Sequence, residues 1–290
     1  MEWFTIYNYT IDVNSYLINS SNPPDYKTHK VHYSGDPSKK VDIVIIPEGY
    51  TKSELKKFEK DCERFVESFF SYSPFQENMD KFNFWIVDSP SEESGTDNPG
   101  KNEWKNTILN THFYTFDSER YLTTRDVKSI RDIAGCVPYD QIYILVNTKK
   151  YGGGGIYNFY NLCSSDHPLS ESVFIHEFGH AFAALGDEYA YSDDPPESRY
   201  DLTVEPYQVN LTTLVDFESK WADLVSDSTM IPTDDNTENI DVIGAFEGAG
   251  YVKTKVYRPM HDCRMRSNRT TEFCPVCKKA IIEMIEFYTL

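Results

Sequence analysis

The stretch from Ser170 to Tyr189 constrains this chain most, because it places two histidines four residues apart within a helical pattern. Residues four apart lie on one face of a helix, so His176 and His180 can bind one metal ion while Glu177 lies beside it. Apolar residues recur here at helical spacing, and a serine at the start can cap a helix. The pattern His-Glu-Phe-Gly-His therefore predicts an active-site helix like that of zinc peptidases.

A catalytic zinc ion usually has three protein ligands and an open position for water, so the two histidines need a partner. Gly186 follows the apolar run and predicts the end of the helix, and two carboxylates come next. We expect Asp187 to be the third ligand, with Glu188 and His261 as the alternatives. Asp187 lies eleven residues after His176, whereas the pattern H-E-x-x-H-x-x-G-x-x-H places its third ligand at ten.

Length, charge and hydropathy limit the class of protein. A chain of 290 residues with 40% hydrophobic content can bury a large core, so we expect one catalytic domain over residues 34–290. Residues 1–33 are expected to hold an edge strand or the remnant of an accessory segment. The net charge of -18 disfavours nucleic acid, whose phosphates attract clustered Lys and Arg. No segment approaches the ~20 apolar residues that span a bilayer.

Strand-like and helix-like patterns alternate along the chain, which predicts an α/β or α+β fold with a twisted mixed sheet. The expected strands are residues 3–9, 41–47, 82–87 and 141–147, and the expected helices are residues 55–69, 123–134, 170–185, 216–224 and 275–285. Thr51 and Glu54 have the spacing of a capping box, and Thr123 or Thr124 is the expected cap of the next helix. Glu48 and Tyr50 are expected to form a structural turn.

Two loops have compositions that favour ligand binding. Residues 88–104 are polar and acidic, so calcium is a possible ligand there, although the EF-hand spacing is absent. Gly153, Gly154 and Gly155 belong to a run of four glycines ahead of the predicted active-site helix. In a zinc peptidase this run would be an edge strand that binds an extended peptide by strand addition, and the alternative is a flexible loop.

Six cysteines allow 15 pairings, so the sequence leaves their connectivity open. They are Cys62, Cys136, Cys163, Cys263, Cys274 and Cys277. Cys274 and Cys277 flank Pro275 at the start of the last predicted helix, and we expect a disulfide between Cys263 and one of them. The alternatives are a structural zinc site that also uses His261 and a redox dithiol.

The chain resembles the bacterial IgA-peptidase family of metallopeptidases. The similar segments occur in the family order across roughly residues 31–290. They are VDIVIIPEGYT from Val41, FNFWIVDSPSEESGTDNP from Phe82, YGGGG from Tyr151, HEFGHAFAALGDEY from His176, GAFEGAGY from Gly244, and CRMRS and FCPVC from Cys263 onward. The resemblance implies a zinc-dependent endopeptidase with a metzincin-like fold that acts on protein or peptide substrates. It does not imply that immunoglobulin is the substrate.

The resemblance also assigns roles to residues after the metal motif. Met265 takes the place of the metzincin Met-turn, an apolar floor beneath the histidines, and residues 244–251 take the place of a wall of the first primed-side pocket. Tyr257 and His261 are candidates for the donor that stabilises the oxyanion, with structural roles as the alternative. The resemblance favours a secreted, periplasmic or cell-surface protein. Since the residues after Met1 do not form an export signal, such a protein would have lost its signal segment.

Together these features predict metal-assisted peptide hydrolysis. Zinc held by His176, His180 and Asp187 would activate a water, and Glu177 would take its proton and pass it to the leaving amine. The rival interpretation is a non-catalytic surface domain that binds host protein or glycan and keeps zinc as a structural element. The intact Glu177 favours the enzyme, and the oligomeric state stays open.

Overall fold

Four parallel strands form the centre of the main sheet. The computed structural model describes residues 7–15, 18, 24–268, 270 and 272–290. The sheet has the order β1-β3-β2-β4-β6-β5, in which β3, β2, β4 and β6 are parallel while the edge strands β1 and β5 are antiparallel to their neighbours. Its strands are β1 (Thr28–Tyr33), β2 (Val41–Glu48), β3 (Phe82–Val87), β4 (Gln141–Val146), β5 (Gly153–Ile156) and β6 (Tyr160–Ser164).

Helices cover both faces of this sheet, so every residue of β2, β4 and β6 is buried. They are α1 (Leu55–Phe69), α2 (Val127–Ala134), α3 (Ser170–Ala183) and α4 (Pro275–Thr289). Successive side chains of a strand point to opposite faces. In β2, Ile43 and Ile45 therefore join the core of α1, α3 and α4, whereas Val44 and Ile46 join the core of α2. The result is a mixed α/β fold.

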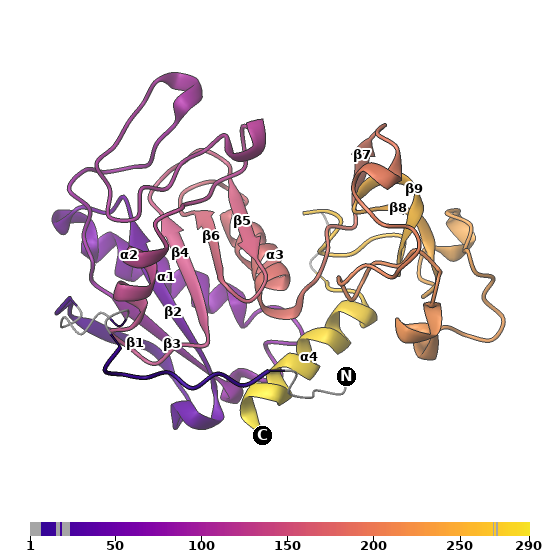
Figure 1. Cartoon of the computed structure of the whole chain (residues 1–290), viewed down its shortest axis with the longest axis horizontal. Helices are drawn as coiled ribbons and strands as arrows, with labels where there is room; N and C mark the ends of the chain where they lie inside the picture. The colour runs from indigo at the N-terminus through magenta and orange to yellow at the C-terminus, as the bar shows by residue number, and fades with distance from the viewer. Residues whose placement is uncertain (1–6, 16–17, 19–23, 269, 271) are drawn as a thin grey trace.

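The second part of the chain, residues 185–262, contains a small sheet and long irregular segments. Its strands β7 (Ala190–Ser192), β8 (Phe246–Ala249) and β9 (Tyr251–Arg258) have the order β7-β9-β8. Figure 1 shows this sheet set apart from the six-stranded sheet, with α4 running from beneath it back to the first part. The short 3-10 helices of the chain are Pro37–Lys39, Lys52–Glu54, Met79–Lys81, Pro99–Lys101, Thr115–Asp117, Pro196–Ser198, Phe217–Ser219, Ala222–Leu224 and Thr237–Asn239.

The strands predicted at 41–47, 82–87 and 141–147 are confirmed, as is the helix at 55–69. Its capping box is present, since Thr51 N donates to the Glu54 carboxylate over 2.9 Å. The cap of α2 is Asp126, which accepts from Ser129 N over 3.1 Å, so the prediction of Thr123 or Thr124 is wrong. Asp126 is better placed, because it directly precedes the first helical residue.

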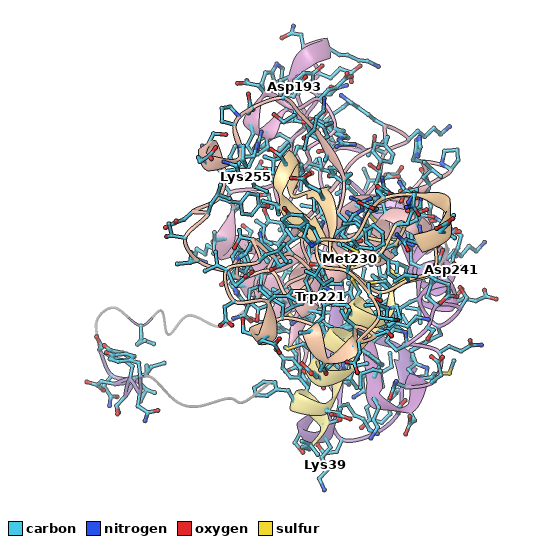
Figure 2. The ribbon with its side chains drawn as sticks, turned by 90° about the vertical axis from the view of Figure 1, so that its right-hand side faces the viewer. Lys39, Asp193, Trp221, Met230, Asp241 and Lys255 are labelled. Carbon is cyan, nitrogen blue, oxygen red and sulfur yellow. The ribbon has the colours of Figure 1, made fainter. Side chains whose placement is uncertain are left out.

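The predicted helix at 216–224 is also wrong, because two short 3-10 helices occupy the segment. Trp221 between them is buried and donates from Nε1 to Gly244 O over 2.7 Å, whereas Met230 farther along is exposed (Figure 2). The burial of Trp221, and not a repeating apolar face, therefore holds this segment in place.

The predicted strand at 3–9 falls mainly on residues outside those described, and residues 7–9 are irregular. The strand of the N-terminal segment is instead β1, which pairs with β3 across Thr28 and Val87. Among the described residues, we find no helix long and apolar enough to cross a membrane.

Glu48 is a structural residue, as predicted for this turn. It lies fully buried at the end of β2 and accepts hydrogen bonds from Thr107 Oγ1 (2.6 Å), Leu109 N (2.9 Å) and Thr111 N (2.8 Å). Burial raises the pKa of its carboxyl group, and these donors oppose that rise. One carboxylate therefore holds the long connection between β3 and α2 against the sheet. Tyr50 is buried nearby and donates to Asp61 over 2.9 Å.

Candidate metal centre and active-site cleft

Helix α3 lies unusually close to the edge strand β5, and the glycines of β5 permit this approach. A Cβ atom added to Gly153 would lie 2.7 Å from Glu177 Oε1. One added to Gly155 would lie 2.5 Å from Glu177 O and 2.9 Å from His180 Cβ. Since side chains do not tolerate such distances, the glycine run is required by helix-to-strand packing. The alternative of a flexible loop is wrong.

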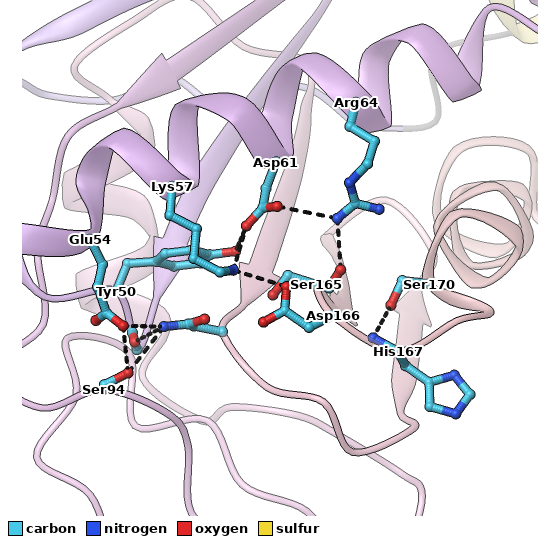
Figure 3. Close-up of polar contacts among 12 residues, drawn as sticks. Tyr50, Glu54, Lys57, Asp61, Arg64, Ser94, Ser165, Asp166, His167 and Ser170 are labelled. Carbon is cyan, nitrogen blue, oxygen red and sulfur yellow. Dashed lines mark hydrogen bonds and ion pairs between the residues drawn. The ribbon is translucent and has the colours of Figure 1, made fainter.

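A polar network fixes the start of α3 against α1 (Figure 3). Arg64 on α1 donates to Ser165 O over 2.8 Å and to Glu171 on α3 over 2.6 Å. Lys57, about two helical turns before Arg64, forms an ion pair of 2.9 Å with Asp166. The loop before α3 is thus tied to α1 at two points, which sets the position of the helix that carries the histidines.

The chain reverses directly after α3, but the left-handed residue that ends the helix is Ala184 and not, as the sequence predicts, Gly186. Ala184 adopts the left-handed conformation (φ 52°) and its N–H donates to Gly179 O, so α3 ends at Ala183 before Gly186. Gly186 is required for close packing instead, since its N–H donates to Asn210 Oδ1 over 2.6 Å and its carbonyl accepts from Asn210 Nδ2 over 3.0 Å. This clamp turns the next residue, Asp187, back toward the helix.

His176, His180 and Asp187 converge, with one ligand atom from each lying within 4.8 Å of the other two. Asp187 Oδ1 is 3.0 Å from His176 Nε2 and 3.3 Å from His180 Nε2, and the two Nε2 atoms are 3.1 Å apart. Two imidazole nitrogens and one carboxylate oxygen form a donor set that fits a catalytic zinc ion. Glu188 and His261, the alternative third ligands, do not belong to this group.

Backbone carbonyls hold both imidazole rings in orientation. His176 Nδ1 donates to Arg264 O over 3.1 Å, and His180 Nδ1 donates to Leu185 O over 2.6 Å. A carbonyl can only accept, so each ring carries a proton on Nδ1 and turns Nε2 toward the centre. Metal-binding histidines are usually fixed in this way.

The second oxygen of Asp187 is held by Tyr251, whose hydroxyl donates to Oδ2 in a short hydrogen bond. Tyr251 has a left-handed backbone (φ 73°) at the start of β9, and the adjoining Gly250 N donates to Asp187 O over 2.8 Å. Strained backbone of this kind persists where the surroundings enforce it. The hairpin of β8 and β9 therefore orients the carboxylate of the candidate ligand.

The ionisable groups of this site interact strongly with one another. Burial raises the pKa of Asp187, but the charges and hydrogen bonds of His180 and His176 outweigh it and hold that pKa well below its ordinary value. Burial lowers the pKa of His180, but the Asp187 carboxylate outweighs it and raises the pKa of His180 to about 9. The carboxylate is therefore ionised and ready to bind a cation.

Glu177 lies next to His176 on α3 but outside the group of three ligand atoms. Its side chain is half-buried and lines the cleft. Burial is the main cause that raises the pKa of its carboxyl group, and the neighbouring His176 and His180 oppose the rise. A carboxyl group with a raised pKa beside a candidate metal site suits a role in proton transfer.

The cleft has a volume of about 770 Å³ and lies between the two parts of the chain. Gly153 and Gly155 line it, together with eight tyrosines at positions 121, 151, 157, 189, 191, 200, 207 and 251. Residues from β5 and α3 form one side, and residues of the second part form the other. His176, Glu177, His180 and Asp187 line the same cleft, so the candidate metal site can be reached from it.

Met265 lies beneath α3, fully buried. A Cβ atom added to Gly179 would lie 2.9 Å from its sulfur, and Met265 O accepts from Glu188 N over 2.8 Å. Met265 therefore packs against the turn of α3 between the two histidines.

The structure does not bring Tyr257 or His261 to the cleft. Tyr257 lies six residues beyond Tyr251 on β9, where its backbone pairs with Thr212. His261 Nδ1 bonds to Asp235 instead. The residue that does reach the site from β9 is Tyr251, which sequence reasoning placed only within a pocket wall. The positive φ angles of Gly248 (91°) and Gly250 (59°) create the turn that aims it.

The predicted disulfide is wrong, because all six cysteines are free. Cys263 Sγ and Cys277 Sγ lie 3.8 Å apart, and Cys274 Sγ lies in the same group. His261 is not part of this group, and Glu188 takes that place.

The calcium prediction for residues 88–104, all of which the structure describes, finds no support. The carboxylates there bind backbone groups, since Asp97 accepts from Lys105 N over 2.6 Å and Glu93 accepts from Asn106 N over 2.7 Å. No three acidic side chains of the loop converge on one point.

The sequence pattern of the family described as IgA peptidase M64 matches residues 30–241 and 234–285 of this chain. A search of curated proteins finds no match. The matched residues cover both parts of the chain and include the histidine pair, the reversal after α3 and the β8–β9 hairpin. The family suggests a metallopeptidase, in keeping with the donor group described above. The chain thus belongs to the IgA peptidase M64 family.

Proposed function

We propose that this protein is a zinc-dependent endopeptidase, in which His176, His180 and Asp187 hold the metal and Glu177 is the general base. The observation that carries the proposal is the convergence of these three ligand groups, beside a carboxylate, in an open cleft of a peptidase-family chain. The proposal includes a metzincin-like catalytic domain over residues 34–290, with Met265 as the floor beneath the histidines. We also propose that the protein is secreted, periplasmic or located at the cell surface.

When bound, zinc would polarise the scissile carbonyl and lower the pKa of an attacking water. The chain supplies the proton transfers. Glu177 lies beside the ligand group, where its carboxylate accepts the water proton and then donates it to the leaving amine. Tyr251 holds the other oxygen of Asp187, so that only Oδ1 faces the histidines.

The substrate backbone would lie along the outer edge of β5. In an antiparallel pair, every second residue directs its backbone N–H and C=O groups away from the partner strand. Ser164 N donates to Gly152 O over 3.1 Å, so Gly154 and Leu162 form the next hydrogen-bonded pair, and the backbone groups of Gly153 and Gly155 face the outer edge. Gly153 O already accepts from Leu122 N over 3.3 Å. Gly155, which lines the cleft, is therefore the residue whose backbone groups would pair with a peptide.

A peptide-library digestion, with cleavage sites read by mass spectrometry, tests the proposal. Glu177→Gln should keep the metal and lose at least about a hundredfold in kcat/KM, because the general base is removed. The matched control is Glu67→Gln, an exposed glutamate on α1 that does not line the cleft. Substantial cleavage by Glu177→Gln would rule out the assigned role. A zinc-loaded wild type that cleaves nothing would favour the non-catalytic surface domain.

A further inference from the structure

Three cysteines and one glutamate form a second buried group that the peptidase chemistry does not use. Cys263 precedes the Met265 turn, Cys274 caps α4 and Cys277 lies in the first turn of that helix. One ligand atom of each, together with a carboxylate oxygen of Glu188, lies within 4.8 Å of the others. All four residues are buried.

Backbone N–H groups point at two of the sulfurs. Cys274 N donates to Cys263 Sγ over 3.2 Å, and Cys277 N donates to Cys274 Sγ over 3.5 Å. Because Cys274 begins α4, its sulfur also lies at the positive end of the helix dipole. The N–H donors and the helix dipole favour the thiolate form of Cys274, and the thiolate is the form of cysteine that binds metal.

The carboxylate of Glu188 points into the same group, and only one of its two oxygens has a hydrogen-bond partner. Its Oε1 accepts from Asn210 Nδ2 over 2.8 Å and lies 3.3 Å from Cys277 Sγ. Its Oε2 has no hydrogen-bond partner, although the residue is fully buried. Burying a carboxylate oxygen without a partner is costly, so a cation at this point is the natural complement.

We propose that Glu188, Cys263, Cys274 and Cys277 bind a second zinc ion that is structural. Three sulfurs and one oxygen complete a four-coordinate shell with no position left for water, as in structural zinc sites, and the Cys-x-x-Cys spacing at a helix start is typical of them. Binding displaces the thiol protons and involves no oxidation. A disulfide between two of the cysteines would still leave Glu188 Oε2 buried without a partner.

This ion would fix the segment that carries the candidate catalytic ligand. Glu188 directly follows Asp187, and its N–H donates to Met265 O over 2.8 Å. The second ion would join the reversal after α3, the turn at Met265 and the start of α4 at one point. Its role is to position Asp187, without touching the substrate.

Measurements on the wild-type chain test the site without any variant. Protein purified with zinc should contain two zinc ions per chain by elemental analysis. Cobalt substitution should give the sulfur-to-cobalt charge-transfer band in the near ultraviolet, which the ligand set His176, His180 and Asp187 cannot produce. Unfolding with a chelator should expose six free thiols. Absence of the sulfur-to-cobalt band, or loss of two thiols to a disulfide, would overturn the proposal.

Variants separate this site from the catalytic one. Cys274→Ser should lower the content to one zinc and abolish the charge-transfer band, whereas His176→Ala should lower the content to one zinc and keep the band. Cys136→Ser is the matched control, because its sulfur lies near Pro24 O outside the group, and it should keep both ions. One zinc that is unaffected by His176→Ala, with the band present, would support this site and contradict the proposed catalytic site.

Discussion

Asp187 and Glu188 are adjacent in the chain, yet their carboxylates belong to two different groups of potential metal ligands. Asp187 faces the histidines of α3, and Glu188 faces the cysteines around the start of α4. Hydrogen bonds from Glu188 N to Met265 O (2.8 Å) and from Gly250 N to Asp187 O (2.8 Å) hold the backbone between them. One two-residue segment therefore couples the cleft to the interior of the fold.

Tyr251→Phe removes the hydroxyl that holds Asp187 Oδ2. We expect zinc affinity at the catalytic site to fall about tenfold to a hundredfold, since partners of metal ligands typically contribute that much. Competition with a coloured chelator measures it. Tyr257→Phe, on the same strand and outside the cleft, is the control and should leave the affinity unchanged. Equal affinities for all three proteins would remove Tyr251 from the site.

Gly155→Ala places a methyl group 2.5 Å from Glu177 O and 2.9 Å from His180 Cβ. Helix α3 must move away from β5, so we expect a loss of about 1–3 kcal/mol in the free energy of unfolding and a fall in peptidase activity. Denaturant unfolding and the cleavage assay measure the two effects. Gly135→Ala is the control, because its nearest contact is Arg131 O at 3.1 Å, far from the cleft. An active, fully stable Gly155→Ala would contradict the tight packing.

Asn210→Ala removes one side chain that binds the backbone of Gly186 and the carboxylate of Glu188. We expect a loss of about 3 kcal/mol in the free energy of unfolding, because buried donors and acceptors are left without partners. Zinc analysis should show weaker retention at both sites. Asn239→Ala, which removes only an exposed hydrogen bond to Asp234 O, is the control. A change in stability no larger than that of the control would refute the clamp.

The metal-free protein should show a pH dependence set by His180. Its pKa in the folded chain is about 9, above the ordinary value of 6.5, so its protonated form stabilises the fold below pH 6.5 and that contribution is lost as the pH rises through about 9. The same proton competes with the metal, so zinc binding should weaken as the pH falls below about 9.

Histidine NMR of the chelator-treated chain measures this titration directly. The resonance absent from His180→Gln should titrate with a midpoint near 9, and the thermal midpoint of the metal-free wild type should fall more steeply toward pH 9 than that of the variant. A midpoint near 6.5 would show that Asp187 does not act on His180.

Sequence periodicity was sufficient to predict the elements that form from local interactions. The strands β2, β3 and β4 have buried apolar runs, α1 has a capping box and an apolar face, and α3 places His176 and His180 on one side. Each of these properties depends on residues only a few positions apart, so the amino-acid sequence is enough to predict it.

Tertiary contacts decided the rest. Whether Asp187 or Glu188 faces the histidines depends on the left-handed Ala184 and on the clamp from Asn210, which comes more than twenty residues later. The meeting of Glu188 with Cys263 and the start of α4 depends on contacts across 75 or more positions, and no local pattern encodes such a separation. The sequence determined which groups can bind metal, and packing between distant segments determined which of them share a site. The reason is that the direction of a side chain at a chain reversal is set by its tertiary contacts and not by the residues next to it in the sequence.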